Sequence, residues 1–291
     1  MNITSSLSHD LALAAQHYFQ RELRINFSTL KTEMDYIDRM HRRIEKLEFL
    51  WNNIMDMYLG NSRPIITMQS YFIHKTPQVT FDVISKKKSI EFGDLLYVYN
   101  ENQSNGYQKQ NALLLQAKMR DNHQLDPDQL YLYSCWPDFS FTNSSMVNRK
   151  FTIDTQPNSH LGARYLYLEK TVSSFVPFRW AKTARPRPKL CEHNCDFHYL
   201  WELLGLMDFS RGKELDGDWG QAINEVVNWV KYNNVPYTNR TQGNRAAAML
   251  SMLATNSSNG KNINVQSFES KEAKKGFWLV VVNADNIITN G

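Results

Sequence analysis

Residues 92–119 hold two apolar runs separated by a polar loop, and no other part of the chain restricts the fold as much. The runs are FGDLLYVYN and NALLLQAKM, and the loop between them, ENQSNGYQKQ, contains the step Asn105-Gly106. An Asn-Gly step between apolar runs is typical of a hairpin turn. The pattern therefore predicts two adjacent antiparallel strands, with the start of the first beside the end of the second.

The first 60 residues follow a helical period instead. Apolar residues recur at steps of three and four from Met34 to Ile54, which predicts an amphipathic helix. Together with the run HDLALAAQHYFQREL, this period assigns residues 6–59 to helix, with Ser28 as an N-cap and Pro64 beyond the end.

Short apolar runs return between residues 64 and 180, and most of them read as strands. Their β-branched and aromatic residues favour extended structure. The expected strands are 64–74, 78–84, 89–100, 111–119, 163–170 and 173–180. A short helix is expected after residue 125, because Asp126 is a good N-cap and Pro127 suits the first helical position.

A proline-punctuated basic linker at 181–195 separates this region from the last part of the chain. Helical periods follow at 196–209, 218–232 and 244–255, and residues 276–283 predict one late strand. The expected fold is therefore α/β (α+β), with a mixed central sheet flanked by helices. We divide it into a helical N-terminal section (1–60), a core (61–190) and a mainly helical C-terminal section (191–291).

The composition is that of an ordinary globular protein. Of the 291 residues, 42% are hydrophobic and 21% are charged, and the formal net charge of +4 is compatible with a polyanionic partner without requiring one. Three cysteines do not form a disulfide framework, which indicates a reducing compartment. No run approaches the roughly 20 apolar residues of a membrane span, and the first apolar patch is too short for a signal peptide. We expect a cytoplasmic protein without membrane contact.

Three polar side chains are expected to meet where the two strands of the hairpin lie side by side. Asp94 opens the first strand, and Gln116 and Lys118 point to one face near the end of the second. A half-buried carboxylate or ammonium without a partner costs several kcal/mol, so this placement needs a reason. One reason is a structural ion pair between Asp94 and Lys118, and another is a catalytic site.

The order of elements and these three residues resemble the PD-(D/E)XK nuclease superfamily. The order is helix, three strands, helix and strand, with Asp94 opening the second strand and the tripeptide QAK at 116–118 ending the third. The variant D…QxK, with glutamine in place of the second acid, is similar to Mrr-type restriction endonucleases. The resemblance covers residues 33–170, departs from the family where Gly93 stands in place of proline, and leaves the C-terminal section unexplained.

The resemblance implies a restriction-endonuclease-like core and a metal-dependent nuclease that hydrolyses phosphodiester bonds, with DNA as the favoured substrate. Asp94 and Gln116 would bind Mg²⁺ or Mn²⁺ through oxygen atoms, and Lys118 would orient the attacking water and offset charge on the phosphate. A neutral glutamine lowers the negative charge of the site, so metal affinity without DNA should be weak. We expect Mn²⁺ to support activity at least as well as Mg²⁺.

A further acid is expected near this site. Glu91 lies three residues before Asp94, so a regular strand would point it to the opposite face, where it would be a solvated acid; a bulge at Gly93 would bring it into the site. The superfamily also often supplies an acid from the preceding helix. Glu45 and Glu48 are the candidates there, ahead of Glu33, and each also reads as an ordinary solvated helix charge.

Two basic segments suit phosphate contacts. One is the lysine triplet before Glu91, which also reads as a hairpin turn, and the other is RWAKTARPRPK at 179–189, which also reads as a solvated basic segment. The candidate residues are Lys86, Lys87, Lys88, Arg179, Trp180, Lys182, Arg185, Arg187 and Lys189. Trp180 could stack on a base.

Two other features concern ligand binding. The segment CEHNCDFH contains Cys191, His193, Cys195 and His198, but zinc ligands usually come as two pairs separated by a longer loop, so we do not expect zinc. Gln129 follows Lys118 on the next expected helix, and it is a candidate substrate contact.

Two other function classes remain open from the sequence. The first is a non-catalytic nucleic-acid-binding or scaffold subunit that retains the nuclease fold, and the missing acid at position 116 favours it. The second is a structural interaction protein that uses exposed aromatic side chains. A role in antiviral defence, a homo-oligomer and a partner subunit of a defence system are all compatible with the nuclease interpretation. Nothing in the sequence separates DNA from RNA or gives a sequence preference.

Overall fold

The structure is a computed structural model of the chain. It describes residues 4–25, 27–83, 86–103, 106–119, 125–156, 162–169, 181–186, 197–233 and 276–286.

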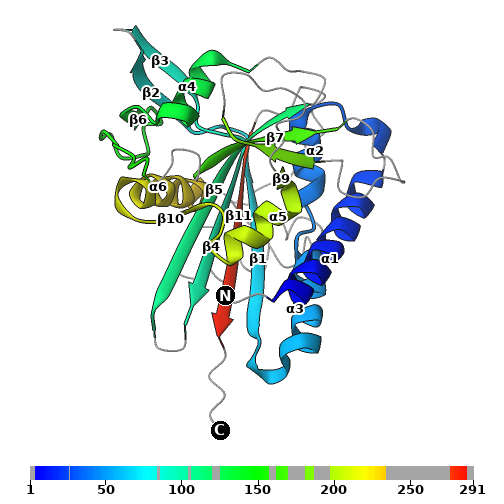
Figure 1. The fold of residues 1–291 in the computed structure, drawn as a ribbon. Helices are drawn as coiled ribbons and strands as arrows, with labels where there is room; N and C mark the ends of the chain where they lie inside the picture. The colour runs from blue at the N-terminus through cyan, green and yellow to red at the C-terminus, as the bar shows by residue number, and fades with distance from the viewer. Residues whose placement is uncertain are drawn as a thin grey trace, which may run out of the picture.

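A mixed β-sheet forms the centre of the molecule (Figure 1). Its strands are β1 (Pro64–Ile73), β4 (Leu95–Asn102), β5 (Gln108–Met119), β7 (Ala163–Leu168), β8 (Ala181–Ala184), β9 (Phe197–His198), β10 (Lys213–Glu214) and β11 (Phe277–Asn286). In the described part of the chain, their spatial order is β1-β11-β4-β5-β7-β8-β9, and β10 pairs with β5. The expected α/β class with a mixed central sheet and flanking helices is therefore confirmed.

The hairpin predicted from residues 92–119 is present as β4 and β5. The two strands are antiparallel, with Leu95 opposite Leu115 and Asn102 opposite Gln108. Strand β7 then lies parallel to β5 on its other side. The expected strand at 163–170 is thus confirmed as β7, while the expected strand at 173–180 lies outside the described residues.

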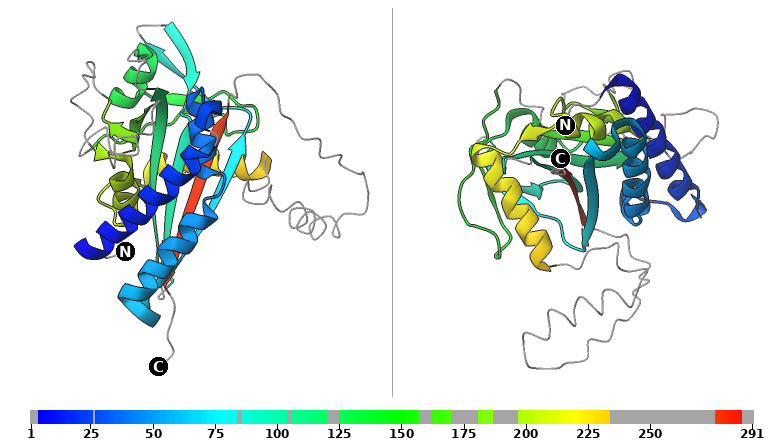
Figure 2. Two further views of the ribbon diagram at one scale, coloured as in Figure 1. Left: turned by 90° about the vertical axis from the view of Figure 1, so that its right-hand side faces the viewer. Right: turned by 90° about the horizontal axis from the view of Figure 1, so that it is seen from below.

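Helices cover both faces of the sheet (Figure 2). One face packs against α1 (Ser5–Arg24), α2 (Glu33–His41), α3 (Glu45–Leu59) and α5 (Tyr199–Met207). The other packs against α4 (Pro127–Cys135) and α6 (Gly217–Asn233). Alternate residues of β5 divide between the two cores: Leu113 and Leu115 belong to the first, and Ala112 and Leu114 to the second. Both faces of the sheet are therefore buried.

The N-terminal helical region is broken into three helices, and its second helix begins later than predicted. Thr32, not Ser28, caps α2: Asp35 donates its backbone N–H to the Thr32 hydroxyl, and the Asp35 carboxylate accepts the Thr32 backbone N–H in return. Ser28 lies instead in a short 3₁₀ turn. The capping box supplies partners for amides that a helix start leaves unpaired, and this favours Thr32.

A second, small sheet stands beside the central one. It contains β2 (Gln78–Val83), β3 (Lys86–Glu91) and β6 (Phe139–Phe141), in the order β3-β2-β6. The lysine triplet lies in strand β3, so the turn interpretation of these residues was wrong. The helix predicted after residue 125 is confirmed as α4, with the Asp126 carboxylate accepting the N–H groups of Asp128 and Gln129.

The late strand predicted at 276–283 is confirmed as β11, but its place could not be foreseen. It lies between β1 and β4, antiparallel to the first and parallel to the second. The C-terminal section therefore contributes a central strand to the same sheet as the core. The helix expected at 244–255 lies outside the described residues. Among the helices that the structure describes, none is long and apolar enough to cross a membrane.

Candidate functional site

Asp94 lies directly before β4, and its backbone is held from both neighbouring strands. Its N–H donates to the Leu115 carbonyl of β5 at 3.0 Å, and its carbonyl accepts from the Trp278 N–H of β11 at 2.9 Å. The position of the carboxylate therefore depends on the hairpin and on the last described strand together.

The side chains of Asp94 and Gln116 are in direct contact. Gln116 Nε2 donates to Asp94 Oδ2, and the Ala117 backbone N–H donates to the same oxygen at 2.8 Å. Both side chains are buried, with 8% of Asp94 and 4% of Gln116 exposed. This contact agrees with the geometry predicted from the hairpin, because Asp94 stands opposite Gln116 when the register is extended by one residue.

Lys118 lies on the same face of β5 as Gln116. Ala117 and Met119 belong to the core on the opposite face, so strand alternation turns Lys118 toward the side that carries Asp94. The side chain is half-buried. Its positive charge lowers the pKa of Asp94, which places the two groups within electrostatic reach.

Glu33 reaches the same end of β5 from the first turn of α2. Its Oε1 accepts the Met119 backbone N–H at 3.1 Å, and its negative charge raises the pKa of Asp94. The helix acid that contacts this end of the sheet is therefore Glu33, which the sequence ranked below Glu45 and Glu48. The Thr32–Asp35 capping box is the sequence signal that would have placed Glu33 at a helix start.

Glu45 and Glu48 lie elsewhere on α3. Glu48 Oε2 accepts the Met68 backbone N–H of β1 at 2.6 Å. The charges that act on Glu45 come from Lys46, Arg43 and Glu22 on the helical side of the sheet. Their surroundings are therefore α1, α3 and β1, and not the adjoining ends of β4 and β5 that hold Asp94 and Gln116.

Burial raises the pKa of Asp94 to about 7. The largest cause is loss of hydration, and the hydrogen bond from Ala117 opposes it. Glu91 and Glu33 raise the value further, while Lys118 lowers it. A carboxyl group with a pKa shifted by burial and by several nearby charges is typical of a functional site.

Glu91 ends β3 and lies near Asp94 without hydrogen bonding to it. Its Oε1 accepts from the Thr76 hydroxyl at 3.3 Å. The break between β3 and β4 comes at Phe92 and Gly93, where a Cβ on Gly93 would come within 2.7 Å of the Leu114 side chain. The single strand expected at 89–100 is therefore divided: β3 ends at Glu91 in the small sheet, and β4 begins at Leu95 in the central sheet, so this is a break between two strands and not a bulge within one. The charge of Glu91 nevertheless acts on Asp94 from nearby.

Helix α4 holds this break through two side chains one turn apart. Gln129 Nε2 donates to the Glu91 carbonyl at 3.0 Å, and the Tyr133 hydroxyl donates to the Phe92 carbonyl at 2.7 Å. Gln129 Nε2 also donates to Gln116 Oε1. The sequence suggested that Gln129 contacts the substrate. Only 5% of Gln129 is exposed, and the structure places it against Gln116 instead of on an open surface.

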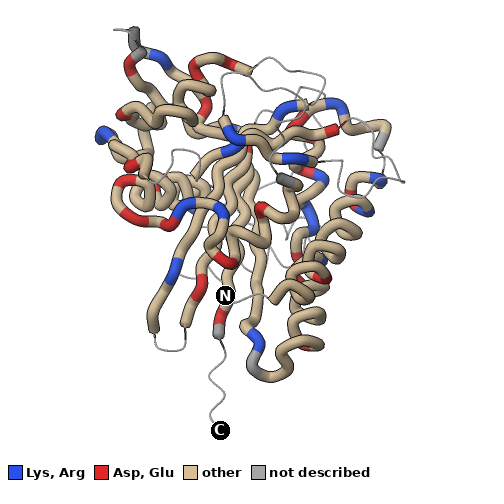
Figure 3. Tube along the Cα trace, viewed as in Figure 1, with Lys and Arg blue, Asp and Glu red and all other residues tan. Residues whose placement is uncertain are grey.

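The basic candidates are spread over the molecule. Lys88 forms an ion pair with Asp128 of α4 at 3.0 Å. Lys182 lies in β8 and is half-buried, and Arg185 follows that strand. Arg179, Trp180, Arg187 and Lys189 lie outside the described residues, as do the side chains of Lys86 and Lys87. Figure 3 shows basic and acidic positions interspersed along the upper edge of the central sheet and on the small sheet.

The zinc candidates do not form a site within the described residues. His198 caps α5, where its Nδ1 accepts the Leu200 N–H at 3.3 Å, and its three proposed companions lie outside the described ranges. In the part of the chain that the structure describes, no three His, Cys, Asp or Glu side chains are placed to hold a metal ion. The Asp94 site offers a smaller donor set: the Asp94 carboxylate and the amide oxygen of Gln116.

These two donors fit Mg²⁺ or Mn²⁺, because both ions prefer oxygen ligands and Mg²⁺ keeps several waters. One adjustment is needed. Gln116 presents nitrogen to Asp94, so its amide must turn before Oε1 could share a cation with that carboxylate.

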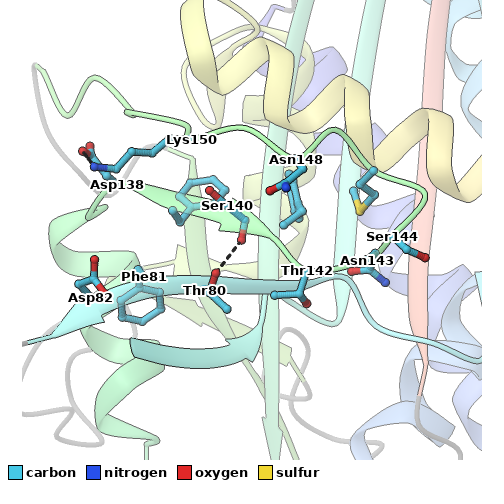
Figure 4. Close-up of a pocket in the computed structure, with 13 residues that line it drawn as sticks. Thr80, Phe81, Asp82, Asp138, Ser140, Thr142, Asn143, Ser144, Asn148 and Lys150 are labelled. Atoms are coloured by element: carbon cyan, nitrogen blue, oxygen red, sulfur yellow. Dashed lines mark hydrogen bonds and ion pairs between the residues drawn. The ribbon is translucent and has the colours of Figure 1, made fainter. Parts of the chain in front are cut away.

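A pocket of about 520 Å³ is lined by residues of β2, of β6 and of the segment that follows β6, and Asp94 is not among its lining residues (Figure 4). Hydroxyl and amide groups line much of it, including Thr80, Ser140 and Asn148. Its charged residues are Asp82, Asp138 and Lys150, and Lys150 forms an ion pair with Asp138 at 2.7 Å. The pair neutralises itself, so the pocket offers polar groups without a free basic side chain for phosphate.

Comparisons with protein-family models, with curated proteins and with solved structures found no match for this chain.

Proposed function

We propose that this protein is a metal-dependent nuclease that hydrolyses phosphodiester bonds, with DNA as the favoured substrate. The observation that carries the proposal is the contact between Asp94 and Gln116 at the adjoining ends of β4 and β5, with Lys118 on the same face. Glu33 adds the acid that nucleases of this class often take from a preceding helix.

The order of elements around the site supports a restriction-endonuclease-like core. An antiparallel hairpin, β4–β5, is followed by helix α4 and then by β7, which is parallel to β5. The resemblance implies helix, three strands, helix and strand; here β2 and β3 precede the hairpin and β6 lies between α4 and β7, and these three strands form the small sheet. The insertion of β11 between β1 and β4 is an addition to that plan.

The proposed chemistry divides among the residues at the site. A bound Mg²⁺ or Mn²⁺ would supply a more nucleophilic water and shield the charge of the phosphate. Asp94 would bind the cation, and Gln116 would join it through Oε1. Lys118 would orient the water and stabilise negative charge on the phosphate oxygens. The small sheet, whose strand β3 carries three lysines, projects beyond the end of the central sheet near α4 and is our proposed nucleic-acid contact (Figure 1).

Plasmid nicking tests this function. Supercoiled plasmid is incubated with the full chain and Mg²⁺ or Mn²⁺, beside the variants Asp94→Asn and Lys118→Met. Each substitution should lower the nicking rate on the order of 10²–10³-fold, because it removes a cation ligand or a group that stabilises transition-state charge. The matched controls are Asp56→Asn and Lys231→Met, which change exposed residues on α3 and α6.

Cleavage that persists in both site variants would contradict the proposal. We expect Mn²⁺ to serve at least as well as Mg²⁺, because its larger ionic radius and its affinity for nitrogen and oxygen ligands relax the geometry that the cation demands.

The alternative is a nucleic-acid-binding or scaffold subunit without catalysis. It is favoured by the single carboxylate in direct contact with Gln116 and by the nitrogen that Gln116 turns toward it. Under this alternative, gel retardation of DNA or RNA would occur without metal and without cleavage, and Asp94→Asn would leave it unchanged.

A further inference from the structure

A continuous series of hydrogen bonds joins four polar groups and ends at the Asp94 carboxylate. The Glu91 carbonyl accepts from Gln129 Nε2, and the same nitrogen donates to Gln116 Oε1. Gln116 Nε2 then donates to Asp94 Oδ2. Gln116 and Gln129 are both buried, so water does not compete for these bonds.

The direction of this series is set by its first member. A backbone carbonyl only accepts hydrogen bonds, so Gln129 has to turn its nitrogen toward Glu91. Because that nitrogen also faces Gln116, Gln116 has to present its oxygen there. Its nitrogen is then left to face the Asp94 carboxylate, which is also an acceptor. Turning either amide would bring two donors or two acceptors together.

We propose that Gln129 is a positioning residue that holds the amide of Gln116 with its nitrogen toward Asp94. We call the pair of Gln129 and Gln116 the amide latch. While the latch is closed, Gln116 Oε1 is held away from any cation at Asp94. The inference rests on the proposed function, since it concerns the divalent cation of that same site.

The latch makes cation binding depend on a rearrangement. Gln116 becomes a ligand only when its amide turns by half a revolution, which breaks its bonds to Gln129 and to Asp94. A cation therefore has to displace two hydrogen bonds before it gains the second ligand. This accounts in structural terms for the weak metal affinity expected of a site with glutamine in place of an acid.

A double-mutant cycle tests the latch by a measurement that does not require activity. Mn²⁺ binding is measured by isothermal titration calorimetry on the metal-free full chain as wild type, Gln129→Met, Gln116→Glu and the double variant. Methionine keeps the length of glutamine but cannot donate. In the background with Gln116, Gln129→Met should lower the Kd roughly three- to tenfold, the effect of one hydrogen bond.

The background with glutamate at position 116 gives the contrast. A carboxylate has oxygen at both positions and needs no particular orientation, so Gln129→Met there should leave the Kd unchanged or raise it. Gln129→Asn is a second variant, which keeps a buried amide but is one methylene too short to reach Gln116. Gln110→Met is the matched control on the same strand, where Gln110 donates to Asn100 at 2.8 Å.

The outcomes separate failure of the amide latch from failure of the proposed nuclease function. A Kd that Gln129→Met raises by the same factor in both backgrounds, or leaves unchanged with Gln116, overturns the latch and leaves the nuclease proposal standing. The absence of Mn²⁺ binding in all four proteins, including the two with glutamate at position 116, overturns the latch, and the plasmid assay with Asp94→Asn decides the nuclease proposal separately. Thermal melts of each variant by circular dichroism separate a lost latch from a lost fold.

Discussion

Two buried polar clusters lie on opposite faces of β4, and they differ in the groups that surround them. The Asp94 cluster contains Asp94, Gln116 and Gln129. The His41 cluster joins His41 to the hydroxyls of Tyr97 and Tyr199. Both clusters are hydrogen-bonded through several members, so satisfaction of polar groups alone does not tell a functional site from a structural one.

The His41 cluster is closed within the helical core. His41 Nδ1 donates to the Ile37 carbonyl at 2.7 Å, which leaves Nε2 to accept from the tyrosine hydroxyls. Burial lowers the pKa of His41 to about 4, and no charged group contributes to that change. The ring is therefore neutral near pH 7, and the cluster works as a set of neutral hydrogen bonds.

The Asp94 cluster lies at the ends of strands and has charged neighbours. Glu91, Glu33 and Lys118 all act on Asp94, whose pKa rises to about 7. Holding an ionised carboxylate in such a position costs stability, and proteins accept this cost where the charge is used. The surrounding charges, more than burial, therefore distinguish the two clusters.

The largest stability effect is expected from His41→Leu. The substitution removes a hydrogen-bond partner of two buried tyrosines and should lower the free energy of unfolding by about 2–4 kcal/mol. Urea denaturation at pH 7 measures it. Plasmid nicking should be unaffected at a temperature where the variant stays folded, and a large loss of nicking there would break the distinction between the clusters.

The pH dependence of the free energy of unfolding tests whether His41 is buried in its neutral form. Because the folded-state pKa of His41 lies below its ordinary value of 6.5, the unfolded chain takes up a proton first as the pH falls. Wild type should therefore lose stability relative to His41→Leu between pH 6.5 and about 4. Parallel pH profiles of the two proteins would show that His41 is not buried in its neutral form.

Asp94→Asn should instead raise the free energy of unfolding at pH 8. The folded-state pKa of Asp94 is raised, so wild type loses stability as the pH rises from about 4 through 7. Asparagine avoids this loss, and its Oδ1 can accept both bonds that Oδ2 accepts now. We expect a gain of about 1–3 kcal/mol at pH 8 that disappears near pH 4. A destabilised variant at pH 8 would contradict the view that Asp94 is kept for function.

Tyr97→Phe should have the smallest effect. The hydroxyl of Tyr199 lies 3.2 Å from His41 Nε2 and remains as a donor, so the change should cost about 1 kcal/mol. Thermal unfolding measures it, with Tyr99→Phe as a control for loss of a buried hydroxyl on the same strand. A cost equal to that of His41→Leu would mean that the cluster acts as one indivisible unit.

The parts of the site that the sequence predicted are those that depend on local geometry. Asp94 and Gln116 belong to one hairpin, and strand alternation with a short turn brings them together whatever the rest of the fold does. The same reasoning placed Lys118 on the shared face. The helix cap at Asp126 followed from equally local chemistry.

The parts that the sequence missed depend on contacts between distant segments. Glu33 reaches the site because α2 starts at Thr32 and packs against the end of β5. Helical periodicity identifies an apolar face but does not tell which helical turn meets the sheet. For this reason the sequence ranked Glu45 and Glu48 above Glu33. The hydrogen bond from Gln129 to Gln116 likewise depends on how α4 crosses the strands.

The sequence by itself determined the hairpin, the class of the fold and the contact of the carboxylate at 94 with the amide at 116, because short-range register and side-chain alternation are properties of adjoining segments. Only the tertiary structure decided that β11 enters between β1 and β4 and holds the Asp94 carbonyl through Trp278. Pairing across nearly 200 residues is selected by burial of both faces of the sheet, and that choice leaves no mark in any local pattern.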